Sequence, residues 1–341
     1  MEIKTVGLDL AKSVFQVHGV DASGRVALRK TLKRSQVLTF FATLTPCLVG
    51  MEACGGSHHW ARKLSEQGHT VRLISPQFVK PYVKSNKNDA ADAEAICEAV
   101  QREHMRFVPI KTIDQQAILA VHRAREGFVR ARTAIANQIR GFLAEFGLVL
   151  PVGIHNLEKV IALVDEHDLP AAFRQLIEAQ LFHRRELEER IAELERQLQA
   201  WHRAHETSQR LAAIPGIGLI TATAVAATIG DARQFKNARQ MAAWLGLVPK
   251  QHSSGGNPRL LGISKRGDVY IRKLLILGAQ TVLRHAQHRP NAERLWHVRV
   301  AQRRNVPIAA VALANKNART MWALLAHNRV YDPFHRAALA A

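Results

Sequence analysis

The spacing of apolar and polar positions divides the 341-residue chain into a part with alternating strand and helix signals and a part made of helices. In the first part, short apolar runs, with period-two character at 14–20, lie between segments of helical period. The pattern predicts a strand at 6–10, a hairpin over 14–28, strands at 48–53 and 70–74, and helices at 57–67 and 88–103. We therefore expect an α/β domain over residues 1–110.

Beyond residue 110 the apolar residues recur every three or four positions, which favours helices. The pattern predicts a helix over 113–146, a connection with a short helix over 147–170, and a helix over 173–205. The last of these fits an antiparallel helical pair or a coiled coil equally well. We expect a helical connector over 111–205, as a helical pair or a coiled coil, and a mostly helical C-terminal domain over 206–330. The arginines of the first helix fit a solvated face or a nucleic-acid contact equally well.

The first strand carries an acid among apolar residues. Val6, Leu8 and Leu10 suit a covered sheet, whereas Asp9 does not, because an unpaired buried carboxylate costs several kcal/mol or takes up a proton. A bound divalent cation would remove that cost, since hard metals prefer oxygen ligands. Hydrogen bonds from backbone amides, or a place at a frayed strand end, would remove it equally.

Three further acids follow in the same domain, one in a predicted strand and two at the start of a predicted helix. Glu52 lies in a second apolar strand, and Asp89 and Asp92 share one face of the first turn of a helix that Asn88 is expected to cap. Acids in a first turn also complement the helix dipole without any metal. In this order the elements match the RNase H/RuvC fold, in which such acids hold two divalent ions for phosphoryl transfer. We expect Mg²⁺, or Mn²⁺ in its place.

The C-terminal part contains two polar, glycine-rich segments. Pro215-Gly216-Ile217-Gly218 between two helices predicts a helix-hairpin-helix, in which Gly216 and Gly218 bring backbone amides close to a phosphate. A packing loop between helices is the other interpretation. Further on, Ser253-Ser254-Gly255-Gly256 reads as a flexible turn, although a serine hydroxyl there could attack phosphorus if activated. Residues 233–304 hold fifteen Lys and Arg against two acids, among them the candidate phosphate contacts Arg259, Lys265 and Arg266.

The overall charge of the chain indicates which class of partner it binds. A net charge of +20 and a pI of about 10.6 favour a polyanion as partner. No apolar run approaches the roughly 20 residues of a membrane span. Three separated cysteines without a CxxC pair argue for a reducing compartment and against a zinc site. We expect no membrane partner and a cytoplasmic, nucleoid-associated bacterial protein.

Several short motifs occur in a defined order along the chain. In the N-terminal part they are Gly7-Leu8-Asp9-Leu10-Ala11-Lys12, Met51-Glu52-Ala53, Lys87-Asn88-Asp89-Ala90-Ala91-Asp92-Ala93 and Phe107-Val108-Pro109-Ile110-Lys111. In the C-terminal part they are Ile214-Pro215-Gly216-Ile217-Gly218, Trp244-Leu245-Gly246-Leu247-Val248-Pro249, Ser254-Gly255 and Ile263-Ser264-Lys265-Arg266-Gly267. They are spread along most of the chain, and the resemblance they carry covers nearly all of it. The chain closely resembles the DEDD insertion-sequence transposases of the IS-one-ten family, whose members act as RNA-guided recombinases.

The resemblance implies roles for the residues already singled out. The DEDD acids would be Asp9, Glu52, Asp89 and Asp92, which hold Mg²⁺ in a RuvC-like domain. A C-terminal serine would link covalently to DNA during strand exchange, and Ser254 matches that position, with Ser253 next to it. The acid site and the serine would come from different protomers of a dimer or tetramer.

The family also uses a structured noncoding guide RNA that pairs with target and donor DNA. Sequence choice would then rest on base pairing, which suits a basic chain without a sequence-reading module. Two other functions compete. A RuvC-like metal-dependent nuclease or junction resolvase would use water as nucleophile, and a non-enzymatic nucleic-acid-binding protein would bind DNA without cutting it.

Overall fold

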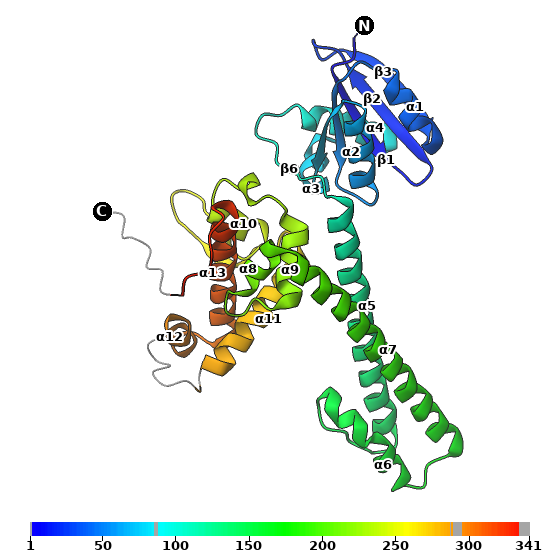
Figure 1. The fold of residues 1–341 in the computed structure, drawn as a ribbon, viewed down its shortest axis with the longest axis vertical. Helices are drawn as coiled ribbons and strands as arrows, with labels where there is room; N and C mark the ends of the chain where they lie inside the picture. Colours follow the sequence, from blue (N-terminus) through cyan, green and yellow to red (C-terminus); the bar gives the residue numbers. More distant parts are fainter. Residues whose placement is uncertain (1, 85–87, 287, 289–294, 334–341) are drawn as a thin grey trace. The chain divides into compact units, whose positions relative to one another are not determined.

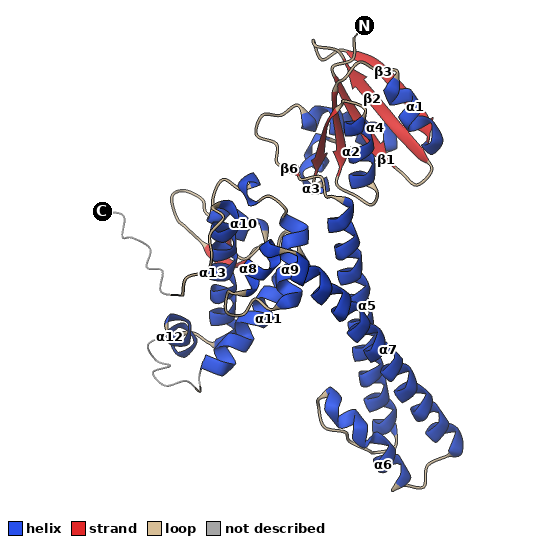
Figure 2. Ribbon diagram, viewed as in Figure 1, coloured by secondary structure: helices blue, strands red, loops and turns tan. Residues whose placement is uncertain are grey.

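The computed structural model describes residues 2–84, 88–286, 288 and 295–333. It divides into two compact units, Met1–Ile113 and Asp114–Ala341. Figure 2 shows the strands gathered in the N-terminal unit, with one short hairpin in the second. This arrangement confirms the predicted mixed architecture, an N-terminal sheet domain followed by a helical region. Lys87 of the third N-terminal motif lies outside the described residues.

The N-terminal unit is built on one mixed sheet with strand order β3-β2-β1-β4-β5-β6. Strands β1, β4 and β5 are parallel, whereas β2, β3 and β6 pair antiparallel to their neighbours. The bounds are β1 Thr5–Leu10, β2 Val14–Val20, β3 Val26–Lys33, β4 Leu48–Glu52, β5 Thr70–Ile74 and β6 Phe107–Val108. A hairpin followed by parallel strands fits a RuvC-like domain, as predicted.

Helices cover both faces of this sheet. On one face, α1 (Val37–Ala42) and α2 (Ser57–Glu66) bury an apolar cluster with Val6, Leu8 and Met51. On the other face, α4 (Asp89–Val100) packs across β1 and β4. The short segments η1 (Arg34–Gln36), α3 (Pro76–Val79) and η2 (Lys80–Tyr82) complete the unit. Burial on both faces explains why the central strands read as continuous apolar runs.

The second unit begins with two long helices, α5 (Ile113–Glu145) and α7 (Ala171–Ala204), joined through η3 (Ile154–Lys159) and α6 (Val160–Asp165). Figure 1 shows the two helices lying side by side, with α6 at the end of the pair. Phe146 packs on Phe173, and Arg125 pairs with Glu195, so the helices run antiparallel. The apolar stripe of α7, with Leu181 and Leu187, packs against α5 of the same chain. Of the two interpretations left open, the structure therefore contains the antiparallel helical pair.

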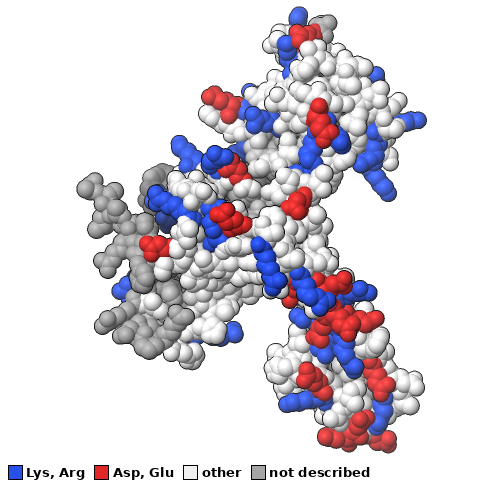
Figure 3. All heavy atoms as spheres, viewed as in Figure 1, with Lys and Arg blue, Asp and Glu red and all other residues white. Residues whose placement is uncertain are grey.

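The arginines of α5 are mostly occupied within this helical pair. Arg125 donates to Glu195 at 2.8 and 2.6 Å, Arg130 donates to Glu126 at 3.3 Å, and Arg140 donates to the Gly153 carbonyl oxygen at 2.7 Å. Figure 3 shows Lys and Arg interspersed with Asp and Glu along this pair. These ion pairs favour a structural role for the arginines over a continuous phosphate-binding face.

The remaining helices of the second unit share one apolar core. Their bounds are α8 Glu206–Ala212, α9 Leu219–Ile229, η4 Ala232–Gln234, α10 Ala238–Trp244, α11 Val269–Ala286, α12 Trp296–Arg303 and α13 Val306–Ala326. Strands β7 (Pro249–Gln251) and β8 (Leu260–Ile263) form the short hairpin. No helix among the described residues is both long and apolar enough to cross a membrane.

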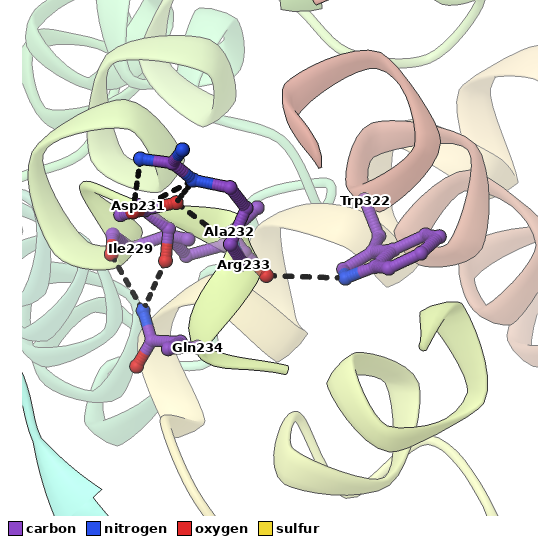
Figure 4. A network of polar contacts seen from close by, with 6 residues as sticks. All are labelled: Ile229, Asp231, Ala232, Arg233, Gln234 and Trp322. Carbon is purple, nitrogen blue, oxygen red and sulfur yellow. Dashed lines mark hydrogen bonds and ion pairs between the residues drawn. The ribbon is translucent and has the colours of Figure 1, made fainter. Parts of the chain in front are cut away.

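A polar network ties the turn after α9 to α13 (Figure 4). Trp322 Nε1 donates to the Ala232 carbonyl oxygen at 3.1 Å. It also donates to the Phe235 carbonyl oxygen, which is not drawn, at 3.2 Å. Gln234 Nε2 donates to Ile229 and Asp231 carbonyl oxygens, each at 2.8 Å. Backbone carbonyls of the turn thus find side-chain donors, as loops packed against a core require.

A second network joins the helical pair to the C-terminal core. His122 of α5 is buried between the hydroxyls of Thr223 on α9 and Tyr270 on α11, at 3.0 and 3.1 Å. Burial lowers the pKa of His122 to about 4, so the imidazole is neutral at pH 7. Lys273 of α11 also donates to Glu126 at 2.8 Å. These contacts hold the base of α5 against the C-terminal helices as one unit.

Candidate functional site

The strand register places two of the predicted acids side by side. β1 and β4 are parallel, with Gly7 opposite Gly50 and Leu8 opposite Met51. The next positions along the two strands are Asp9 and Glu52. Both residues stand at the carboxyl ends of their strands and are half-buried. Because side chains alternate along a strand, these two acids project on the same face as Gly7 and Gly50.

Helix α4 lies on that face and brings the other two acids to the same edge. A Cβ on Gly7 would overlap the Ala93 carbonyl oxygen and lie 2.5 Å from the Cys97 nitrogen. Cys97 also reaches back to the Thr5 carbonyl oxygen at 3.8 Å. Helix α4 therefore runs antiparallel to β1. Cys97 lies near Thr5, and Ala93, one helical turn earlier, lies against Gly7. One further turn leads to the helix N-terminus, so Asp89 and Asp92 are directed toward the edge that carries Asp9.

The start of α4 is defined as the sequence predicts. Asn88 has an extended backbone, and its side-chain oxygen accepts the Ala91 N–H at 2.8 Å. Asp89 and Asp92 fall in the first helical turn, Asp89 exposed and Asp92 half-buried. The positive end of the helix dipole therefore lies at the same edge as the four carboxylates.

Cys54 lies beside the strand acids and was not singled out from the sequence. Burial raises the pKa of its thiol, and the negative charges of Glu52 and Asp9 raise it further. The thiol is thus close enough to both carboxylates to sense their charge. Among the described residues, no three His, Cys, Asp or Glu side chains form a ready metal cluster. The fold brings the backbone positions of the four acids to one edge, with their side chains still apart.

The predicted serine lies at the tip of the β7–β8 hairpin. The Asn257 N–H donates to the Ser254 carbonyl oxygen at 3.0 Å, and the two residues form an isolated bridge. Gly255 and Gly256 between them have φ values of +55° and +79°. Positive φ at both central residues is what a tight type I′ turn requires. The two glycines thus present Ser254 at the first position of an exposed tight turn.

The two neighbouring serines differ in their contacts. Ser253 Oγ accepts the Gln251 side-chain amide at 3.0 Å and the Arg259 N–H at 3.2 Å. Among the described residues, Ser254 Oγ has no hydrogen-bond partner in the structure. Ser253 therefore holds the two arms of the loop together, whereas the Ser254 hydroxyl is available to a ligand.

The hairpin rests on two segments whose backbones pack closely. A Cβ on Gly246 would overlap Arg266, and one on Gly267 would overlap the Trp244 carbonyl oxygen. The Lys265 N–H donates to the Gly246 carbonyl oxygen at 3.1 Å, and Lys265 itself has a positive φ of 56°. The segments around Trp244–Val248 and Ser264–Gly267 therefore form one rigid base for the loop.

A buried arginine completes this base. Arg272 of α11 is 7% exposed, and its Nη1 donates to the Leu245 and Arg266 carbonyl oxygens at 3.0 and 2.8 Å. Sequence reasoning counted Arg272 only as part of the basic block. Its position three before Leu275 and seven before Ala279, both core residues, was the signal that it faces inward. The side chains of Arg259, Lys265 and Arg266 are exposed, and no described carboxylate lies within ion-pair distance of them.

The Pro215–Gly218 turn does join two helices, α8 and α9, but its first glycine has a packing role. Gly216 has a φ of +88°, and a Cβ there would lie 3.0 Å from the Gly278 carbonyl oxygen of α11. Gly218, at the N-cap of α9, is exposed with open space beside it. Phosphate binding at this turn stays a prediction, and its geometry restricts the approach to the Gly218 side.

Comparisons with known proteins match both parts of the chain. A family model described as a transposase, of the IS110 DEDD type, matches residues 6–147, and one described as "Transposase IS116/IS110/IS902 family" matches residues 208–296. A "Probable family 20 transposase" of Pseudomonas aeruginosa is 55% identical over 98% of this chain and 100% of its own length. The transposase for insertion sequence element IS1111A of Coxiella burnetii is 44% identical, over 97% of this chain and 92% of its own length. The transposase for element IS1328 of Yersinia enterocolitica is 43% identical, over 97% of this chain and 99% of its own length.

The chain belongs to the IS110 (IS-one-ten) family of DEDD transposases. Transposases are enzymes that bind DNA and cut and rejoin it. The enzyme class predicted from the motifs is thereby confirmed. The acid edge falls within the matched N-terminal segment, and the serine hairpin falls within the matched C-terminal one.

The donor set of this transposase fits a divalent cation. Four carboxylates at one sheet edge are hard oxygen ligands, and Mg²⁺ takes one or two carboxylates while keeping waters and substrate phosphate. DEDD domains of this type use divalent metal ions, so Asp9, Glu52, Asp89 and Asp92 are the residues that would hold Mg²⁺ or Mn²⁺.

Close packing of α4 on the sheet predicts a strong effect of adding one methyl group in this transposase. In Gly7→Ala, the new Cβ meets backbone atoms of α4, which cannot move aside as a side-chain tip does. We expect a loss of about 1–3 kcal/mol in unfolding free energy, together with weaker divalent-metal binding because α4 shifts. Urea unfolding and metal titration of the purified protein check this. Gly55→Ala is the matched control, since a Cβ there meets nothing within 4 Å. An unchanged stability of Gly7→Ala would contradict the close docking of α4.

Proposed function

We propose that this chain is the transposase of an insertion sequence that cuts and rejoins DNA through a covalent serine–DNA intermediate, with the DEDD acids as its metal site. The observation that carries the proposal is the β1–β4 register, which makes Asp9 and Glu52 neighbours at the edge that the α4 N-terminus faces. An acid edge of this kind suits phosphoryl transfer, because carboxylates there position metal ions against a phosphate.

Ser254 is the proposed nucleophile. It sits on an exposed tight turn, its hydroxyl has no partner among the described residues, and exposed cations follow at Arg259, Lys265 and Arg266. In the reaction, Ser254 Oγ forms a bond to phosphorus and the bond from phosphorus to the leaving sugar oxygen breaks. The leaving oxygen takes up the proton that the serine loses.

Rejoining reverses this exchange. The hydroxyl of a second strand attacks the same phosphorus, and the serine regains a proton as its oxygen leaves. The energy of the broken phosphodiester is kept in the serine ester, so strands are rejoined without ATP. Arg259, Lys265 and Arg266 would hold the phosphate by charge and hydrogen bonds during both steps.

The four acids at the sheet edge would act on the phosphate and on the serine through a bound metal ion. Asp9, Glu52, Asp89 and Asp92 would hold the divalent ion, which would supply positive charge against the phosphate and lower the pKa of the attacking hydroxyl. No described His, Asp or Glu contacts the Ser254 hydroxyl, so the serine needs activation from outside its own hairpin. We propose that the acids supply it, with acids and serine contributed by different protomers of a dimer or tetramer.

We further propose that sequence choice rests on a structured noncoding guide RNA. The chain is strongly basic, at +20, and neither matched family segment is described as a sequence-reading module. Base pairing between guide and DNA would then select the element junction and the target. The proposed domain division is a RuvC-like part over 1–110, a connector over 111–205 and a transposase part over 206–330, in a cytoplasmic, nucleoid-associated protein.

The experiment that tests the proposal traps the covalent intermediate. Purified protein, the cognate RNA and labelled junction DNA are incubated with Mg²⁺, and the products are separated on a denaturing gel. A protein–DNA adduct is expected, and peptide mass spectrometry should place the nucleotide on Ser254. An adduct on Ser253 would keep the mechanism and move the nucleophile by one residue. Cut ends without any adduct would favour the water-using nuclease, and binding without cutting would favour the non-enzymatic protein.

A further inference from the structure

A basic hollow opens at the edge of the sheet that carries the acids. Its volume is about 660 Å³. The residues used below are Ser13 before β2, Lys33 at the end of β3, Arg34 and Ser35 in η1, and His59 and Trp60 in α2. None of them belongs to the DEDD set or to the serine hairpin.

The strand register fixes the place of this hollow. β2 runs antiparallel to β1, with Phe15 opposite Leu10, and Val14 is paired with Lys33 of β3. The start of β2 and the end of β3 therefore lie at the carboxyl end of β1, next to Asp9. Trp60 belongs to the apolar cluster of α1 and α2, which covers the sheet face opposite α4. The hollow and the acids thus share one edge of the sheet and approach it from opposite faces.

Arg34 is held in position by aromatic rings and by the backbone. Its guanidinium lies over the Trp60 ring at 5.1 Å and near the Phe15 ring at 5.9 Å. The two rings pack edge to face at 5.1 Å, with Phe15 fully buried and Trp60 5% exposed. The Arg34 N–H also donates to the Ser13 carbonyl oxygen at 2.9 Å, which joins two sides of the hollow. A guanidinium stacked in this way keeps its N–H edge for an outside acceptor.

The described residues do not balance the charge of the hollow. Among the described residues, no carboxylate lies within 4.0 Å of the Lys33 ammonium or the Arg34 guanidinium. By contrast, Lys63 and Arg102 of the same unit pair with Glu66 and Glu98. The hollow thus holds a set of donor groups for which the described residues supply no acceptor. They are the two cations, the hydroxyls of Ser13 and Ser35, and the exposed imidazole of His59. Such a set binds phosphate oxygens.

We propose that this hollow binds a backbone phosphate of the DNA strand that passes the acid edge. The inference rests on the proposed function, since it supplies a second contact for the strand whose phosphate reaches the acids. It adds Lys33 and Arg34 as positioning residues, which hold the DNA in register without touching the reacting phosphate. Backbone contacts of this kind fix orientation and carry no sequence information.

The test is a salt titration of DNA binding by the full-length protein without divalent metal. The probe is a fluorescein-labelled DNA duplex of random sequence, followed by anisotropy at several KCl concentrations. Each phosphate contact contributes about 0.9 to the slope of log K against log [KCl] on duplex DNA. Arg34→Gln and Lys33→Gln should therefore each lower the magnitude of the slope by about 0.9, and the double variant by about twice that. Arg34→Lys, which keeps the charge, should retain the wild-type slope.

Arg25→Gln is the matched control. Arg25 lies in the turn between β2 and β3, near the start of β1, and is exposed at the opposite edge of the sheet. Its slope should equal that of wild type, and thermal unfolding should show that every variant is folded. An Arg34→Gln slope equal to wild type, or an equal loss in Arg25→Gln, would overturn the proposal. A loss seen with an RNA duplex and absent with DNA would also overturn it.

The assay separates this inference from the serine mechanism. Ser254→Ala should bind with the wild-type slope, because binding without metal does not involve the nucleophile. If covalent adducts never form but Arg34→Gln still lowers the slope, phosphate binding in the hollow is supported and the serine mechanism is refuted.

Discussion

The Ser254→Ala protein is expected to form no covalent adduct with DNA and to exchange strands at least about a thousandfold more slowly than wild type, as loss of a nucleophile does in other enzymes. The change removes one exposed oxygen from a turn whose shape depends on Gly255 and Gly256. The hairpin should therefore keep its structure, and only the group that attacks phosphorus is lost. Adduct formation on a denaturing gel and single-turnover strand exchange measure the two effects.

Ser253→Ala is the matched control for this change. Its hydroxyl accepts hydrogen bonds from the Gln251 side chain and the Arg259 N–H, so its loss loosens the loop without removing the nucleophile. Two exposed hydrogen bonds contribute about 1 kcal/mol, which corresponds to a rate decrease of about fivefold. If Ser254→Ala retains the adduct while Ser253→Ala loses it, the assignment of the two serines is reversed. Cutting at the wild-type rate by both variants would exclude a serine nucleophile.

The Asp9→Asn protein is expected to lose about a thousandfold or more in the rate of DNA cutting while it still folds and binds DNA. Asparagine has the size and shape of aspartate, so the β1–β4 pairing should survive. It lacks the negative charge that a divalent cation requires, and Asp9 is the acid that lies beside Glu52 in the sheet. Cutting of labelled junction DNA across a range of Mg²⁺ and Mn²⁺ concentrations gives the rate and the apparent metal affinity.

Glu98→Gln serves as the control for an acid of the same unit outside the DEDD set. Glu98 lies on α4, is half-exposed and pairs with Arg102. Surface ion pairs of this type contribute about 1 kcal/mol or less, so cutting should stay within about fivefold of wild type. An Asp9→Asn protein that cuts as fast as Glu98→Gln would show that the acid edge is not the metal site. Unchanged DNA binding in both variants would locate the defect of Asp9→Asn in the chemical step.

Most helices and strands could be predicted from short-range sequence patterns. The Asn88 cap, the apolar runs of β1, β4 and β5, and the hairpin over 14–28 were predicted correctly because each depends on neighbours a few residues apart. The same holds for the long helices α5 and α7, whose bounds lie within two residues of the expected ones at each end.

Long-range packing decided the roles that the sequence left open. Gly7 reads as an ordinary strand glycine until α4 is seen to occupy the space of its side chain. Gly216 reads as a phosphate-binding glycine until Gly278 is seen against it. The arginines of α5 fit a solvated face or a nucleic-acid contact equally well until Glu195 of α7 is seen beside Arg125. In each case the deciding partner lies on another helix or a distant strand, and one sequence does not state that distance.

By itself, then, the sequence determined the element order, the basic charge, the acids and serine of interest and the resemblance to DEDD transposases, because composition, periodicity and motif spacing are local properties of the chain. Only the tertiary structure decided that Asp9 and Glu52 are neighbours in register, that α4 directs Asp89 and Asp92 to the same edge, and that Arg34 lies stacked over a hollow beside them. The physical reason is that strand register and helix docking depend on which buried surfaces fit together, and that fit involves atoms many residues apart.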